Sequence, residues 1–157
     1  MIRAHRDTGG TSMVEFALVA PVLFLLLVGI LDLGRAVNAY VTVSNASREG
    51  SHYAGLHPTA APSAIASAVR QRVAPLDPAA VEVTATYYDG TTFQPWPASG
   101  GVPTASPAVY VPVRVSVCFP WSAATFIGQF FPATSPAPCG GAANAYFVSS
   151  STVDMLR

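Results

Sequence analysis

Charged side chains are scarce in this sequence, and lysine is missing altogether. Charged residues make up 10% of the 157 residues, all basic residues are arginine, and the formal net charge is zero. The sequence contains no run of basic residues, which argues against nucleic acid as a partner. Mean hydropathy is nevertheless +0.41, which is too apolar for a disordered chain and unusual for a soluble domain of this size. A localised hydrophobic segment would account for the excess.

The motifs of common enzymes and metal sites are missing as well. The sequence has no H-E-x-x-H, G-x-S-x-G, P-loop or G-x-G-x-x-G pattern, so we expect no catalytic residues, no cofactor and no enzymatic activity. His52 and His57 are poorly spaced for metal binding, and Cys118 and Cys139 do not form a C-x-x-C pair. A zinc site needs about four ligands, so we expect no metal site.

One hydrophobic segment dominates the N-terminal part of the chain. Residues 16–31 carry no charge, and within 11–31 the single charged residue is Glu15. A helix over 11–31 would be about 31 Å long, close to the roughly 30 Å hydrocarbon core of a bilayer. The rest of the chain is too small to enclose a helix that is apolar all round. We therefore predict a transmembrane segment over 11–31, in which Pro21 predicts a kink or a melted turn.

The helix is predicted to continue beyond the membrane. Asp32 and Arg35 are spaced i,i+3 and can form an ion pair at the membrane exit. No proline occurs between residue 21 and Pro58, so we expect one helix over about 12–54, with an extension over 32–56. The side chains at helical spacing on this extension are Leu33, Val37, Tyr40, Val41 and Ser44. They predict an amphipathic half that packs on a small globular head.

The remaining residues, 57–157, predict this head, a small α+β unit without internal repeats. Residues 63–73 indicate a short helix that Ser63 can cap. Alternating apolar and polar residues predict an antiparallel sheet with strands at 81–88, 110–118 and 145–153. The dipeptide Asp89-Gly90 predicts a two-residue hairpin turn that leads into residues 91–93.

The second of these strands has the clearest pattern. Its valines at 111, 113, 115 and 117 are predicted to face the core. Pro112 falls on the opposite face and suggests an edge position, because proline cannot donate to a sheet ladder.

Aromatic residues and cysteines of the head leave two questions open. Trp96 and Trp121, with the phenylalanines at 126, 130 and 131, form either an exposed adhesive surface or an ordinary core and membrane-facing patch, and the second interpretation is favoured. Cys118 and Cys139 are predicted to form a disulfide if the head lies outside the cytoplasm, and the alternative is two free thiols.

The residues before the apolar segment carry the most specific signal. A short basic leader is followed by Gly10-Thr11-Ser12-Met13-Val14-Glu15-Phe16, which resembles the processing site of type IV prepilins. The resemblance implies that a membrane aspartyl peptidase, the prepilin peptidase, cuts after Gly10. Thr11 would then be the new N-terminus and Glu15 the fifth mature residue.

The carboxylate of Glu15 carries a free-energy cost at the start of a membrane-spanning helix. A carboxylate in a spanning helix costs roughly 2.5–3.5 kcal/mol near the centre and less near the interface. The new α-amino group of a neighbouring subunit could compensate, and the helix N-terminus also favours a negative charge. These considerations predict an assembly role for Glu15 and Phe16. The alternative is that Glu15 reaches the lipid headgroups.

The longer string GGTSMVEFALVAPVLFLLLVGILDLGRAV resembles the N-terminal signature of the TadE family, over about residues 9–50. These are minor pilin-like proteins, or pseudopilins, of tight-adherence (Flp-type) pilus systems. The resemblance implies a type IV pilin-like fold, an anchor in the bacterial inner membrane and an extracytoplasmic head. It also implies a role in assembling an adhesion pilus, with other pilin-like subunits and pilus-assembly proteins as partners. Arg3 and Arg6 place the leader, 1–10, in the cytoplasm by the positive-inside rule.

A secreted soluble binding domain is the alternative to a membrane anchor. Arg3 and Arg6 would then begin a conventional signal peptide with residues 16–31 as its apolar part, cleaved near Ala39. That apolar part is longer than the usual 7–15 residues, and the charged residues Asp32 and Arg35 intervene before the cleavage site. N-terminal sequencing separates the two hypotheses.

Overall fold

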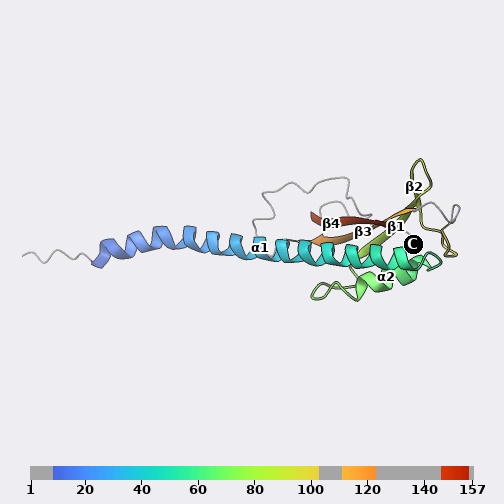
Figure 1. Ribbon diagram of the computed structural model, residues 1–157. Helices are drawn as coiled ribbons and strands as arrows, with labels where there is room; N and C mark the ends of the chain where they lie inside the picture. Colours follow the sequence, from blue (N-terminus) through green and yellow to red (C-terminus); the bar gives the residue numbers. More distant parts are fainter. Residues whose placement is uncertain (1–8, 103–110, 123–145, 156–157) are drawn as a thin grey trace, which may run out of the picture.

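The computed structural model describes residues 9–102, 111–122 and 146–155, with the backbone alone at 146–153. Within these residues the chain forms two helices and one four-stranded antiparallel sheet (Figure 1). The elements are α1 (Gly9–Leu56), α2 (Pro62–Arg70), β1 (Glu82–Tyr88), β2 (Phe93–Pro95), β3 (Pro112–Trp121) and β4 (Tyr146–Met155). The predicted α+β architecture, a long N-terminal helix with a short helix and an antiparallel sheet, is confirmed.

The long helix α1 gives the molecule its elongated shape. Its N-terminal half extends away from the other described elements, and its C-terminal half lies against the sheet and α2 (Figure 1). The helix continues through Pro21 without a melted turn, because one missing hydrogen bond leaves the neighbouring turns of a long helix intact.

The sheet has the order β2-β1-β3-β4, so β3 is an inner strand. The edge position suggested by Pro112 is therefore wrong. Pro112 is the first residue of β3 and lies opposite Met155 of β4, whereas pairing with β1 begins one residue later, at Val113. At that place the proline faces no β1 partner that would need its missing N–H, so it is tolerated in an inner strand.

The core of the head lies between the sheet, α1 and α2. The valines of β3 at 113, 115 and 117 are fully buried, as the alternating pattern predicted. They pack in one cluster with Val43 and Ala46 of α1 and with Ile65 and Val69 of α2. Each buried side chain of this size contributes about 1.5–3 kcal/mol relative to its exposed state.

Gly50 lets α1 approach its neighbours closely. A Cβ atom at this position would lie 2.5 Å from Cγ2 of Val69 and 3.0 Å from Cγ1 of Val115. Carbon atoms in normal contact are about 3.5–4.0 Å apart. The missing side chain therefore sets how tightly α1 fits between α2 and β3.

The short helix begins one residue earlier than predicted. Ala61 occupies the position before the first turn and makes no side-chain cap bond, so the predicted capping by Ser63 is wrong. Pro62 takes the first helical position instead, where its missing N–H costs nothing and its fixed φ favours the helix. The helix ends at Arg70, although Val73 beyond it is still buried in the core.

The hairpin between β1 and β2 has a longer turn than the predicted two residues. Tyr88 pairs with Phe93, so four residues connect the strands. The Asp89 carboxylate accepts hydrogen bonds from the backbone N–H groups of Thr92 and Thr91 and from the Thr91 hydroxyl and Gln94 amide. These bonds hold the pKa of Asp89 well below its ordinary value, the Thr92 and Thr91 N–H groups contributing most.

Candidate membrane and assembly site

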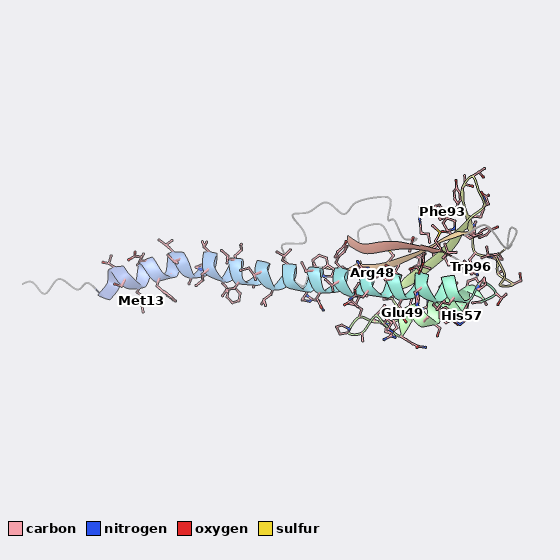
Figure 2. All side chains as sticks on the ribbon, in the orientation of Figure 1. Met13, Arg48, Glu49, His57, Phe93 and Trp96 are labelled. Carbon is pink, nitrogen blue, oxygen red and sulfur yellow. The ribbon has the colours of Figure 1, made fainter. Side chains whose placement is uncertain are left out.

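The N-terminal half of α1 is apolar on all sides and uncovered. Figure 2 shows its side chains, from Met13 onward, pointing outward around the whole helix. Apart from Val28, which is of intermediate exposure, the large hydrophobic residues from Met13 to Leu31 are about half exposed or more, and none of the most apolar 18-residue window of α1 is buried. A core helix of a soluble protein would be mostly buried, so this helix suggests single-pass membrane anchoring.

The residues of the predicted processing and assembly site lie in the first two turns of α1. Gly10, Thr11, Glu15 and Phe16 are all exposed, Phe16 by 71%. A Cβ atom at Gly10 would meet nothing within 4 Å. Among the residues that the structure describes, Glu15 takes part in no ion pair. The head thus leaves these side chains accessible to another molecule.

Asp32 and Arg35 lie where α1 passes from its bare half to its packed half. Nη1 of Arg35 lies 3.5 Å from Oδ1 of Asp32. Asp32 is only 6% exposed, whereas the Arg35 side chain is 57% exposed. The carboxylate is therefore shielded from its surroundings, and the guanidinium is not.

The face of α1 that packs on the head is not the one that the sequence predicted. Leu33, Val37, Tyr40 and Val41 are about half exposed or more. Except for Val43, smaller residues are buried in their place. Beyond Asp32, the buried residues of α1 are Ala39, Thr42, Val43, Ala46, Ser47, Gly50, Ser51, Ala54 and Gly55. Small side chains bring the helix closer to the sheet, and Thr42, Ser47 and Ser51 return hydrogen bonds to carbonyls of their own helix.

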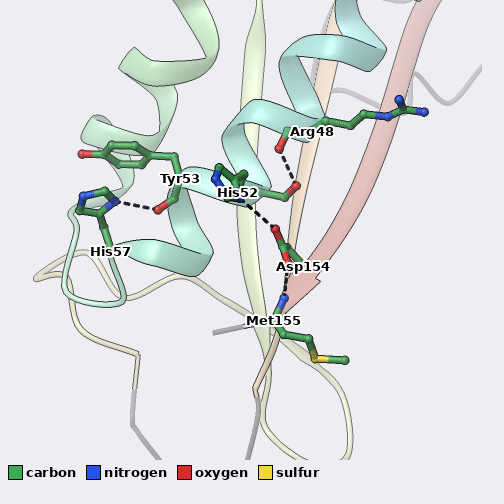
Figure 3. Close-up of polar contacts among 7 residues, drawn as sticks. Arg48, His52, Tyr53, His57, Asp154 and Met155 are labelled. Carbon is green, nitrogen blue, oxygen red and sulfur yellow. Dashed lines mark hydrogen bonds and ion pairs between the residues drawn. The ribbon is translucent and has the colours of Figure 1, made fainter. Parts of the chain in front are cut away.

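Both histidines near the end of α1 have structural partners (Figure 3). Nδ1 of His52 lies 3.6 Å from Oδ2 of Asp154 at the end of β4. His57 stacks on Tyr53, with ring centroids 4.3 Å apart, and its Nδ1 lies 3.0 Å from the Tyr53 carbonyl oxygen. Within 9–102, 111–122 and 146–155, no three metal-type side chains gather at one point.

The predicted aromatic and cysteine sites are described only in part. Trp96 is buried, and its Nε1–H donates to the Ala60 carbonyl at 2.9 Å, as in an ordinary core. Trp121 is half-buried. The phenylalanines at 126, 130 and 131 lie outside the described residues. Cys118 is buried and disulfide-bonded. Cys139 lies outside the described residues, so its pairing with Cys118 stays a prediction.

Comparison with known families gives one match, and it falls on this helix. Residues 10–52 match the family described as TadE-like protein. This range covers α1 from its second residue to the middle of the head core. No curated protein and no solved structure gives a significant match. The match confirms the resemblance predicted from the sequence: residues 10–52 of this chain form a TadE-like segment.

Proposed function

We propose that this protein is a single-pass, minor pilin-like membrane protein that acts in the assembly of a tight-adherence (Flp-type) pilus. One observation carries the proposal. The TadE-like segment coincides with a helix that is bare and apolar in its first half and is built into a folded head in its second half. A membrane-anchored subunit that presents a folded head needs both properties in one element.

The proposed arrangement follows the helix. Residues 1–10 are a cytoplasmic leader, 11–31 span the bacterial inner membrane, 32–56 extend the helix, and 57–157 complete the extracytoplasmic head. The orientation rests on Arg3 and Arg6 in the leader. The disulfide-bonded state of Cys118 supports an oxidising compartment for the head.

Maturation by a prepilin peptidase after Gly10 is part of this proposal. Thr11 and Glu15 would then stand in the first turns of the exposed helix, free to contact another pilin-like subunit. The absence of an ion-pair partner for Glu15 among the described residues supports an intermolecular role. A carboxylate in a membrane helix is retained where it finds a counter-charge, such as the α-amino group of a neighbouring subunit.

A conventional signal peptide fits the geometry less well. Ala39, the proposed cleavage residue of that alternative, is 1% exposed and lies inside uninterrupted helix. Cleavage there would separate two parts of one helix and leave 40–56 alone in the core. The mature N-terminus distinguishes the hypotheses: Thr11 for prepilin processing, Tyr40 for signal-peptide cleavage, and Met1 for an uncleaved anchor.

The experiment tests processing and assembly separately in cells with an active prepilin peptidase. The variant Gly10→Trp is expected to retain residues 1–10, because a bulky side chain obstructs the peptidase at the scissile bond. Mass spectrometry detects the retained leader. Glu15→Ala is expected to be cleaved but to lose co-purification with pilus-assembly proteins. Gly34→Ala is the matched control, since a Cβ atom there also meets nothing within 4 Å.

Retention of the leader in the unmodified chain, with an active peptidase present, would remove the processing step and leave an uncleaved anchor. A reporter fused after Arg157 that is active only outside the cytoplasm tests the orientation. Normal expression without reporter activity would show that the C-terminus lies in the cytoplasm, which would refute the pilin-like assignment.

A further inference from the structure

The exposed apolar surface of α1 does not end where its charge-free run ends. Leu33, Val37, Tyr40 and Val41 lie beyond the Asp32–Arg35 pair, yet each is about half exposed or more. Their successive spacings of four, three and one residues place them on one side of the helix. We call these four residues the outer stripe. On the opposite side, small residues of α1 are buried in the head.

The charge-free run is too short to cross the hydrocarbon core on its own. Residues 16–31 extend about 24 Å as a helix, roughly 6 Å less than the core of a typical bilayer. About four more residues must therefore lie at hydrocarbon depth. They can be added before Phe16, which brings Glu15 into lipid, or after Leu31, which brings Asp32 into lipid.

The structure favours the second extension. Glu15 is exposed and has no ion-pair partner among the described residues, so lipid would surround its carboxylate directly. Asp32 is shielded and lies 3.5 Å from the Arg35 guanidinium. Arg35 is long enough to reach the headgroups with its charged end. Leu33 and Val37, which follow Asp32 on the open side, are themselves apolar.

We propose that lipid contact of α1 continues past Leu31 along the outer stripe, so that the base of the head rests in the headgroup layer of the bilayer. This inference rests on the proposed membrane anchor and shifts its hydrocarbon span from 11–31 to about 16–35. Glu15 then lies at the cytoplasmic boundary, where a carboxylate costs less than in the hydrocarbon.

The composition of the stripe fits phospholipid better than a second protein. The stripe continues directly from the bare membrane half of α1. Near its end lies Tyr40, a residue type that is enriched at membrane–water interfaces. The same side of the helix then becomes polar with Ser44 and Arg48, about 13 Å or more beyond residue 35, where the proposed hydrocarbon span ends, and therefore outside the headgroup layer. Apolar exposure thus stops at about the depth where lipid stops.

Spin-label accessibility in liposomes tests the proposal on the full chain. Variants with one added cysteine, at Leu23, Leu33, Val37 or Asn45, are labelled and reconstituted at low protein density, and the unmodified chain gives the background from its native cysteines. Oxygen, which concentrates in lipid, and a water-soluble nickel complex then compete as relaxing agents. All four positions are exposed, so the labels leave the core intact, and buried-tryptophan fluorescence verifies the fold.

The expected ratio of oxygen to nickel relaxation exceeds one at Leu23, Leu33 and Val37 and falls below one at Asn45. A ratio below one at Leu33 and Val37, with Leu23 still in lipid, overturns the inference and leaves the anchor standing. Low accessibility to both agents at Val37 would mean that a second protein covers the stripe, which also overturns it. A ratio below one at Leu23 refutes the membrane anchor itself.

Discussion

Replacing Gly50 by alanine adds one methyl group at the place where α1 fits between α2 and β3. The new Cβ atom would lie 2.5 Å from Cγ2 of Val69, about 1 Å closer than normal carbon contact. It would also lie 3.0 Å from Cγ1 of Val115. Val69 and Val115 are both completely buried, so neither can turn toward solvent to make room.

Two opposing effects set the magnitude. Overpacking a well-filled core costs about 1–3 kcal/mol. Replacing glycine by alanine inside a helix recovers about 1 kcal/mol of helix propensity. The net loss of unfolding free energy for Gly50→Ala is therefore expected to be about 0–2 kcal/mol. Because this range touches zero, the coupling between Gly50 and Val69 is the sharper quantity.

A double-mutant cycle measures that coupling. Val69→Ala alone leaves a cavity and destabilises the head, but in the Gly50→Ala background the same change also removes the clash. The double variant is expected to be more stable than the sum of the single effects by about 1 kcal/mol or more. Urea unfolding of the full chain in detergent, followed by tryptophan fluorescence, gives the four free energies. With an m-value of about 2 kcal/mol/M, 1 kcal/mol shifts the midpoint by about 0.5 M.

Gly34→Ala is the control, because a Cβ atom there meets nothing within 4 Å. This variant is expected to leave the unfolding free energy of the head unchanged or to raise it slightly. Additive effects of Gly50→Ala and Val69→Ala, within about 0.5 kcal/mol, would refute the close approach of α1 to α2. A Gly50→Ala variant more stable than the unmodified chain would do the same.

Three further predictions concern the head. The folded-state pKa of Asp89 is lowered, so its contribution to the hairpin is present above the unfolded carboxyl value of about 3.9 and is lost as the pH falls from that value through the folded-state pKa. The hydrogen-exchange protection of the turn amides, taken relative to the intrinsic exchange rate at each pH, should therefore fall on acidification in the unmodified chain and stay constant in Asp89→Ala. Trp96→Phe keeps most of the buried ring but leaves the Ala60 carbonyl without its indole donor. Urea unfolding should show that the free energy of unfolding falls by about 1–3 kcal/mol. An unchanged midpoint would contradict that hydrogen bond. Cys118 and Cys139 should resist alkylation in membrane-extracted protein until a reductant is added, and full labelling without reductant would end the predicted disulfide and weaken the case for an oxidising compartment.

Patterns that extend over many residues of the sequence predicted the main elements of the fold. The absence of proline between residues 21 and 58 predicted one continuous helix, because nothing else in that stretch ends a helix firmly. The alternating valines of β3 predicted its buried face, because side chains of a strand point to opposite sides in turn. The TadE-like string located the candidate site on α1.

The packing face of α1 could not be predicted in the same way. Hydropathy favours Leu33 and Val37 as core residues over Ala39 and Gly50, yet in this helix Leu33 and Val37 are exposed, and the buried residues other than Val43 are small. A pattern of apolar residues does not distinguish a surface that faces lipid from one that faces protein, since both exclude water. Likewise, the inner position of β3 depends on its register with β1 and β4, which the local sequence around Pro112 does not contain.

The continuity of α1 also decides how the molecule responds to tension. Val43, Ala46 and Gly50 belong to the same helix as the anchor, so a pull on the N-terminal half travels along one set of backbone hydrogen bonds into the core. The strands lie alongside this helix (Figure 1), so the pull slides α1 past β3 and β4 and strains their contacts together rather than one after another. A flexible linker would let the anchor be drawn away while the head stayed folded. In this chain, a force that draws out the anchor therefore acts directly on the core of the head.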